Sequence, residues 1–165
     1  MDIKTTLIIV HIIGTVLGVG GATFAEIFFL KAIKDGHIEP LEADYLKTTY
    51  KVLRIGMILL VLSGFGFLLF YRLTGRTELL YSEKLWAKLT IVGLILINAI
   101  LFELRKIPAW LGSAVSLTSW YAALILGIVR GGSLSYAKIM YTYIIAVLIV
   151  AVILEVVKKS MHVKL

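Results

Sequence analysis

The chain has 165 residues, of which 60% are hydrophobic, and its mean hydropathy is +0.98. Soluble domains contain about 45–50% apolar residues, so this composition excludes a soluble globular protein and predicts an integral membrane protein. The net charge of +7 does not require a nucleic-acid partner, because the basic residues cluster at the ends of apolar segments, where they meet anionic lipid headgroups. The absence of cysteine excludes disulfides and thiolate metal sites.

Several apolar stretches are long enough to span a bilayer as helices, which takes ~20 residues each. In chain order, the five stretches run from Thr5 to Leu30, Lys51 to Tyr71, Glu83 to Leu104, Ala109 to Val129 and Ala137 to Val157. Pro40 is expected to open a helical extension before the second span, and Ser82 to cap the third. We therefore expect an all-α integral membrane protein, a bundle of about five transmembrane helices that forms a single domain over residues 1–165.

The distribution of Lys and Arg predicts how this bundle is oriented. Five spans place the termini on opposite sides, and cytoplasmic loops are enriched in basic residues. The side of the N-terminus has six basic residues: Lys4, Arg72, Arg76, Lys84, Arg130 and Lys138. The other side has ten: Lys31, Lys34, Lys47, Lys51, Arg54, Arg105, Lys106, Lys158, Lys159 and Lys164. This asymmetry favours a multi-pass protein of the cell membrane, typically the bacterial inner membrane, with the N-terminus outside and the C-terminus cytoplasmic.

His11 lies about two turns inside the first span, at a depth where an ionisable side chain is costly and indicates a functional site. Gly14, Gly18 and Ala22 follow at four-residue spacing. At 100° per residue, Gly18 and Ala22 lie within about 20° of the direction of His11, so the histidine and the small residues share a helix face. Small residues allow close approach of another helix or of a flat cofactor, and both interpretations stay open.

Lys88 is the partner that we expect for His11. At 1.5 Å per residue, His11 lies ~9 Å and Lys88 ~8 Å from the start of its span, and both spans start from the same side. A neutral imidazole is a natural ligand of iron or copper, and an amine suits a second axial position or a haem propionate. In the alternative, Lys88 extends outward beside Lys84 to the lipid headgroups.

Glu26 belongs to a different site, because it lies ~22 Å from His11 along the helix axis and the two residues cannot ligate one metal. Arg54 starts the second span on the same side as Glu26. We therefore expect a structural Glu26–Arg54 ion pair between antiparallel neighbours. The alternative is a carboxylate that takes part in a proton or cation path, together with Arg54 and Asn98.

Two segments, HIIGTVLGVGGATFAEIFFLKAIKDG and SEKLWAKLTIVGLILINAIL, resemble small bacterial membrane proteins of the CopD and HemJ-type group. The proteins nearest to this pattern are uncharacterised, and the HemJ-type members are protoporphyrinogen oxidases. The resemblance implies a haem b site, with the histidine of the first helix at His11 and the lysine of the third at Lys88. It also implies an electron-transfer or oxidoreductase role.

Three functions are therefore open. The first is a haem b protein with a redox role, in which His11 is the metal ligand and Lys88, Gly14, Gly18 and Ala22 line the cofactor site. The second is a non-catalytic membrane subunit or assembly partner, with the glycines as a helix-docking face. The third is a small ion or solute transporter. The expected partners are the lipid bilayer, haem or porphyrin, and a second copy or a membrane partner subunit.

Overall fold

The computed structural model describes residues 2–34, 37–129 and 134–162. These residues form five long helices, α1 (Ile3–Ala32), α2 (Pro40–Leu73), α3 (Glu83–Glu103), α4 (Ala109–Ile128) and α5 (Tyr136–His162), with a short 3-10 helix η1 (Thr77–Tyr81) before α3. Each long helix is sufficiently long and apolar to cross a membrane. The described residues contain no strand. The prediction of an all-α membrane protein with about five spans is confirmed.

Two helix starts follow the sequence signals closely. Pro40 occupies the first turn of α2, where its missing N–H leaves no helical bond unmade. The backbone N–H of Glu39 donates to Glu42 Oε2 at 3.0 Å. This bond is part of a capping box at the N-terminus of α2. Ser82 Oγ accepts from the backbone N–H of Leu85 at 3.3 Å and so caps α3 as expected.

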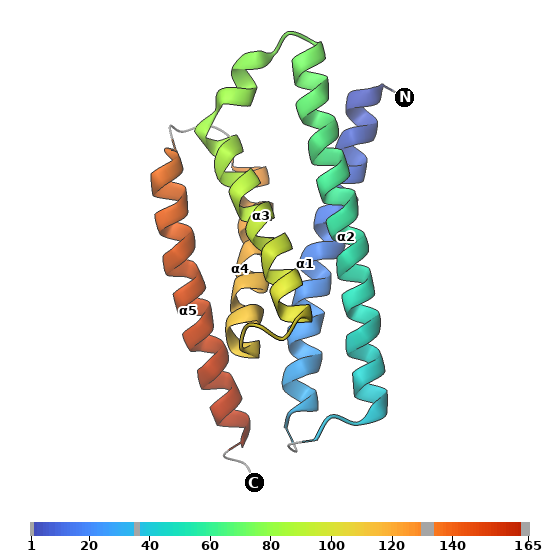
Figure 1. Ribbon diagram of the computed structural model, residues 1–165, viewed down its shortest axis with the longest axis vertical. Coiled ribbons are helices and arrows are strands. Elements are labelled where there is room, and N and C mark those ends of the chain that lie inside the picture. Colours follow the sequence, from blue (N-terminus) through green and yellow to red (C-terminus); the bar gives the residue numbers. More distant parts are fainter. Residues whose placement is uncertain (1, 35–36, 130–133, 163–165) are drawn as a thin grey trace.

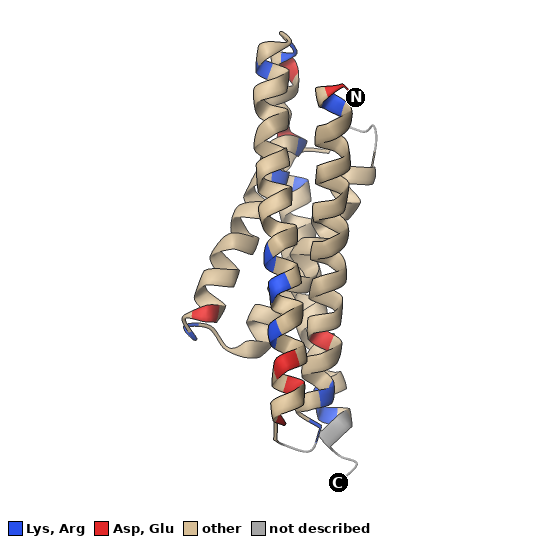
Figure 2. Ribbon diagram, turned by 90° about the vertical axis from the view of Figure 1, so that its right-hand side faces the viewer, with Lys and Arg blue, Asp and Glu red and all other residues tan. Residues whose placement is uncertain are grey.

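The helices form two groups that meet at α4. α1 and α2 pack as an antiparallel hairpin, while α4 contacts α1, α3 and α5. The termini lie at opposite ends of the bundle (Figure 1), as five spans require. Charged residues gather mainly toward the two ends, and the basic residues of α2 extend further inward from the lower end (Figure 2). Which end faces the cytoplasm stays a prediction.

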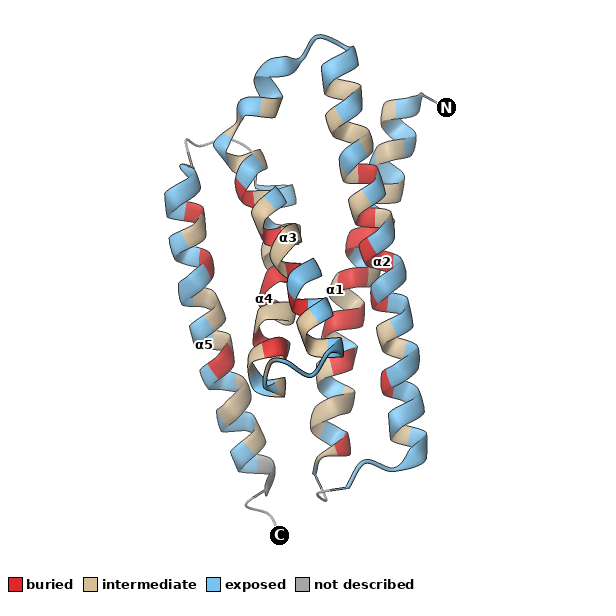
Figure 3. Ribbon diagram, in the orientation of Figure 1, coloured by how far each residue is buried: buried red, intermediate tan, exposed pale blue. Residues whose placement is uncertain are grey.

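Buried residues occupy the facing sides of the helices, and the outward sides are exposed (Figure 3). One core cluster joins α1, α2, α3 and α4 through Ala22, Leu53, Met57, Leu60, Ile95 and Trp120. A second joins α3, α4 and α5 through Ala87, Ile91, Leu126, Ile139 and Tyr143. Large exposed apolar side chains cover the outer surface, as expected where lipid tails rather than water surround the helices.

Candidate functional sites

His11 is held by Ser63, which reaches it from α2. Its Nδ1 lies 2.9 Å from Ser63 Oγ, and Ser63 Oγ also lies 2.6 Å from the carbonyl oxygen of Leu59. A carbonyl only accepts, so the single Ser63 proton goes to Leu59 and the Nδ1–H of His11 donates to Ser63. This assignment leaves Nε2 as the nitrogen with a free lone pair. The ring of Phe67 meets the imidazole edge-on, with the centroids 5.6 Å apart.

Lys88 lies near enough to interact electrostatically with His11, and also with Lys84 on the same helix. The side chain is half-buried. The structure thus brings His11 and Lys88 to the same region, the juxtaposition on which the haem hypothesis depends. However, the described residues contain no group of three or more His, Cys, Asp or Glu that could hold a metal ion. A metal at His11 would therefore depend on the imidazole and groups other than these.

Protein fills the small-residue face beside His11. A Cβ on Gly14 would lie 2.7 Å from the backbone nitrogen of Leu60 in α2. A Cβ on Gly18 would overlap the indole ring of Trp120 in α4, and Ala22 is buried in the core. A porphyrin does not fit over these three residues, because α2 and Trp120 occupy the space. The expectation that Gly14, Gly18 and Ala22 line a cofactor is thereby corrected, and they pack helices instead.

The expected ion pair between Glu26 and Arg54 does not form. Arg54 Nη2 lies instead 2.9 Å from Glu103 Oε2, and the two side chains are 62% and 65% exposed. The Glu26 carboxyl group lies close enough to the side chain of Ser113 in α4 to interact with it. Adjacency of α1 and α2 in the chain favoured a pair between Glu26 and Arg54, whereas Glu103, the last residue of α3, reaches Arg54 instead.

The polar residues of this end nevertheless line one cavity of about 470 Å³ between α1, α2, α3 and α4. Glu26, Arg54 and Asn98, which the sequence grouped as a polar path, all face it. Its further polar and aromatic lining includes Tyr50, Phe102, Glu103, Arg105, Ser113 and Ser116. Apolar side chains such as Ala22, Leu53 and Ile95 complete the wall. The cavity therefore combines an apolar body with a few convergent polar groups, as ligand sites do.

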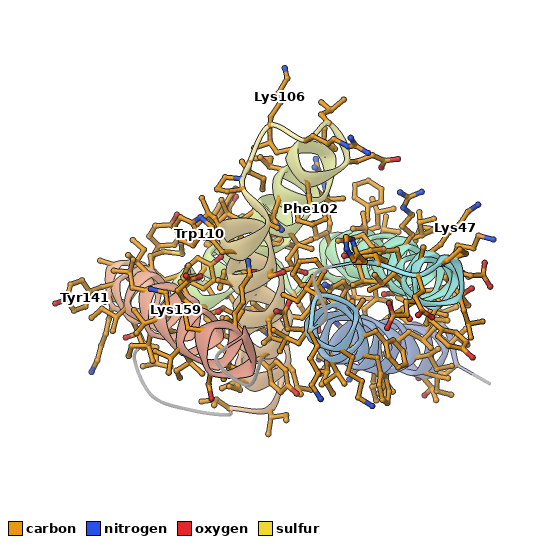
Figure 4. All side chains as sticks on the ribbon, turned by 90° about the horizontal axis from the view of Figure 1, so that it is seen from below. Lys47, Phe102, Lys106, Trp110, Tyr141 and Lys159 are labelled. Atoms are coloured by element: carbon orange, nitrogen blue, oxygen red, sulfur yellow. The ribbon has the colours of Figure 1, made fainter. Side chains whose placement is uncertain are left out.

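Gly112 of α4 contacts two residues of α3 and so holds that helix in place at the cavity wall. Asn98 Nδ2 donates to the carbonyl oxygen of Gly112 at 3.0 Å. The ring of Phe102 covers the same glycine so closely that a Cβ there would overlap it. Seen along the bundle from below, Phe102 lies toward the middle, whereas Lys47 and Lys106 reach the periphery (Figure 4). The rings of Phe102 and Tyr50 have centroids 6.3 Å apart, so they form a neighbouring aromatic pair on the cavity wall.

The charges around the cavity do not all cancel locally. Arg54 and Glu103 neutralise each other, but Glu26 makes no ion pair within the described part of the chain. Lys158, near the end of α5, interacts with Glu26 electrostatically, as does Tyr50. Four residues of this cavity, Tyr50, Phe102, Glu103 and Ser113, were not predicted from the sequence to take part in a site. The only signal in the sequence was the group of hydroxyl residues in the fourth span.

No protein-family model, no curated protein and no solved structure gave a significant match to the chain. The resemblance to the CopD and HemJ-type group therefore stays an expectation.

Proposed function

We propose that the protein binds a small organic cation in the cavity beside Glu26 and carries it across the membrane. The observation that supports this most is the carboxylate of Glu26, which lines the cavity beside Ser113 but makes no ion pair among the described residues. An unpaired charge at membrane depth is costly, so a positively charged ligand is its natural complement.

The rest of the cavity favours an organic cation over a bare metal ion. Magnesium and calcium take six or more oxygen ligands, whereas much of this wall is apolar. Tyr50 and Phe102 present aromatic rings to the cavity, and aromatic faces attract ammonium and similar groups. The volume of about 470 Å³ lies within the usual range for organic ligands, about 300–1,000 Å³.

A carboxylate of this kind also suggests how transport is driven. Glu26 can be neutralised by a proton or by a bound cation, and the two compete for the same oxygens. Binding of a proton on one side would release the organic cation, which is the basis of exchange transport. The proposal places the chain in a bacterial cell membrane, oriented as the basic residues predict.

The test is equilibrium binding of tetraphenylphosphonium to the purified protein in mild detergent. Glu26→Gln keeps the size of the side chain and removes its charge, so we expect saturable binding to weaken by about tenfold or more, corresponding to ~1.4 kcal/mol. Glu155→Gln is the matched control, because Glu155 pairs with Lys159 on α5, away from the cavity. Equal binding by Glu26→Gln and wild type would refute the proposal.

Haem binding at His11 is the second candidate, supported by one observation. The hydrogen bond to Ser63 orients the imidazole and leaves Nε2 free, as second-shell bonds do for metal-ligating histidines. Lys88 is the nearby amine. Bound haem would supply one-electron redox chemistry. Since the glycine face does not accommodate a porphyrin, His11 and Lys88 are the residues of the predicted site that remain for this role.

A further inference from the structure

A second cavity, of about 550 Å³, lies toward the opposite end of the bundle between α4 and α5, and Ile91 of α3 and Thr23 of α1 complete its wall. Its floor includes the buried side chains of Ile91, Leu126, Ile139 and Tyr143. Ile125 on its rim is exposed. The lining is mainly apolar, so this cavity differs from the one at Glu26 in both position and chemistry. We call it the apolar slot.

The apolar slot is long and narrow. Its lining extends from Leu117 on α4 to Val129, the residue that follows α4, and from Lys138 to Val150 on α5, which corresponds to ~18 Å in each case. Spread over that length, its volume gives a mean cross-section of roughly 30 Å². A single hydrocarbon chain needs less width than a helix with side chains, which is about 10–12 Å wide. A single hydrocarbon chain is the occupant that matches this shape in a bilayer.

Basic groups lie at one end of the apolar slot. Lys138 lines it and is exposed, and its side chain makes no ion pair among the described residues. Lys84 Nζ donates to the carbonyl oxygen of Val129, which lines the same end. The nearby carboxylate of Glu83 accepts from the backbone N–H of Tyr136 at 2.6 Å and thus interacts with the first turn of α5. The ammonium groups of Lys138 and Lys84 therefore lie at the end of the slot, at the level expected for lipid headgroups.

We propose that the apolar slot binds one acyl chain of an anionic phospholipid, whose phosphate contacts Lys138 and Lys84. This site is independent of the organic-cation site at Glu26. Each basic residue near the membrane surface makes binding of anionic lipid about fivefold tighter. The apolar lining provides affinity for the chain, and the two lysines provide the preference for negative charge.

The hydroxyl of Thr118 distinguishes a ligand whose headgroup lies at Lys138 from a reversed ligand whose polar group lies deep in the slot. It lines the apolar slot, is 6% exposed and has no hydrogen-bond partner among the residues that the structure describes. It lies eleven positions before Val129 on α4, or ~16 Å along the axis, beyond the reach of a headgroup on Lys138. Such a hydroxyl can turn to a carbonyl of its own helix. A ligand that placed its polar group deep in the slot would instead need this hydroxyl.

Native mass spectrometry of the full chain in mild detergent tests the proposal. Phosphatidylglycerol and phosphatidylcholine with the same acyl chains are added in turn. We expect phosphatidylglycerol to bind preferentially, and Lys138→Gln to reduce this preference by about fivefold. Lys4→Gln, on α1 at the same end of the bundle, is the matched control and should leave the preference unchanged. Thr118→Val should also leave phosphatidylglycerol binding unchanged.

Each of the other outcomes contradicts a specific part of the proposal. Equal binding of the two lipids, or an unchanged preference in Lys138→Gln, would refute the anionic headgroup at Lys138. Weaker binding by Thr118→Val would show that the polar group of the ligand lies deep in the slot, which overturns the proposed orientation. A stable dimer whose formation is prevented by Ala146→Phe, which fills the slot, would identify a second copy as the occupant instead.

Discussion

The guanidinium group of Arg54 lies 2.9 Å from the carboxylate of Glu103, and this ion pair links α2 to α3 rather than α2 to α1. Arg54 is therefore not the counter-ion of Glu26, although both residues line the same cavity. The consequence is a cavity in which Glu26, and also Arg105, make no ion pair within the described part of the chain and are left to interact with a ligand.

Arg54→Gln tests whether this ion pair matters for stability or binding. Both side chains are more than half exposed, and exposed pairs contribute about 0–1 kcal/mol. We expect the free energy of unfolding to fall by less than about 1 kcal/mol and binding of tetraphenylphosphonium to persist. Thermal unfolding in detergent and the binding assay measure the two effects. A loss of binding as large as that in Glu26→Gln would show that Arg54 organises the site.

Gly18→Ala tests the packing of the small-residue face. The added Cβ would overlap the fully buried ring of Trp120, so we expect a destabilisation of about 1–3 kcal/mol. Gly20→Ala is the matched control, because a Cβ at Gly20 has no neighbour within 4 Å and alanine favours a helix by up to about 1 kcal/mol. The measurement is thermal unfolding followed by circular dichroism. Equal stability of Gly18→Ala and Gly20→Ala would mean that α4 does not pack on Gly18.

His11→Ala tests the haem hypothesis. If the protein binds haem b through His11, protein purified from haem-replete cells should show a Soret band that disappears in His11→Ala. His37→Ala, in the connection between α1 and α2, should retain the band. Ser63→Ala should shift or weaken it, because the hydrogen bond that orients the imidazole is lost. A colourless, folded wild-type protein would refute the hypothesis that it binds haem.

Single cysteines can establish the orientation of the chain, which has no cysteine of its own. The excess of basic residues predicts that Asp2→Cys and Arg76→Cys react with a membrane-impermeant maleimide added to intact cells. Lys34→Cys, which lies between α1 and α2, should react only after the membrane is opened. The reverse pattern would place the N-terminus in the cytoplasm and the Glu26 cavity near the outer surface.

Helix positions in this protein were predictable because each span combines length, hydropathy and end signals. Pro40 and Ser82 start their helices as expected, since both act through the local backbone. The depth argument for His11 and Lys88 likewise depends only on helix rise and the order of the spans. Their electrostatic proximity in the structure agrees with that argument.

The contacts between helices were not predictable to the same degree. Helix periodicity places Gly18 on the face of His11 but does not reveal that Trp120 fills that face. The choice of Glu103 over Glu26 as the partner of Arg54 depends on how α3 lies against α2. Lipid tails accommodate any apolar face of a helix. The hydrophobic pattern therefore does not specify which helices contact one another.

The central claim, a site selective for organic cations, is tested most directly by two ions of the same shape and opposite charge. Isothermal titration of tetraphenylphosphonium and tetraphenylborate into the wild-type protein, with detergent alone as the blank, compares them. The account predicts saturable binding of the cation, at least about tenfold tighter than that of the anion, corresponding to ~1.4 kcal/mol. Equal affinity, or a preference for the borate through Arg105 and Lys158, would contradict it.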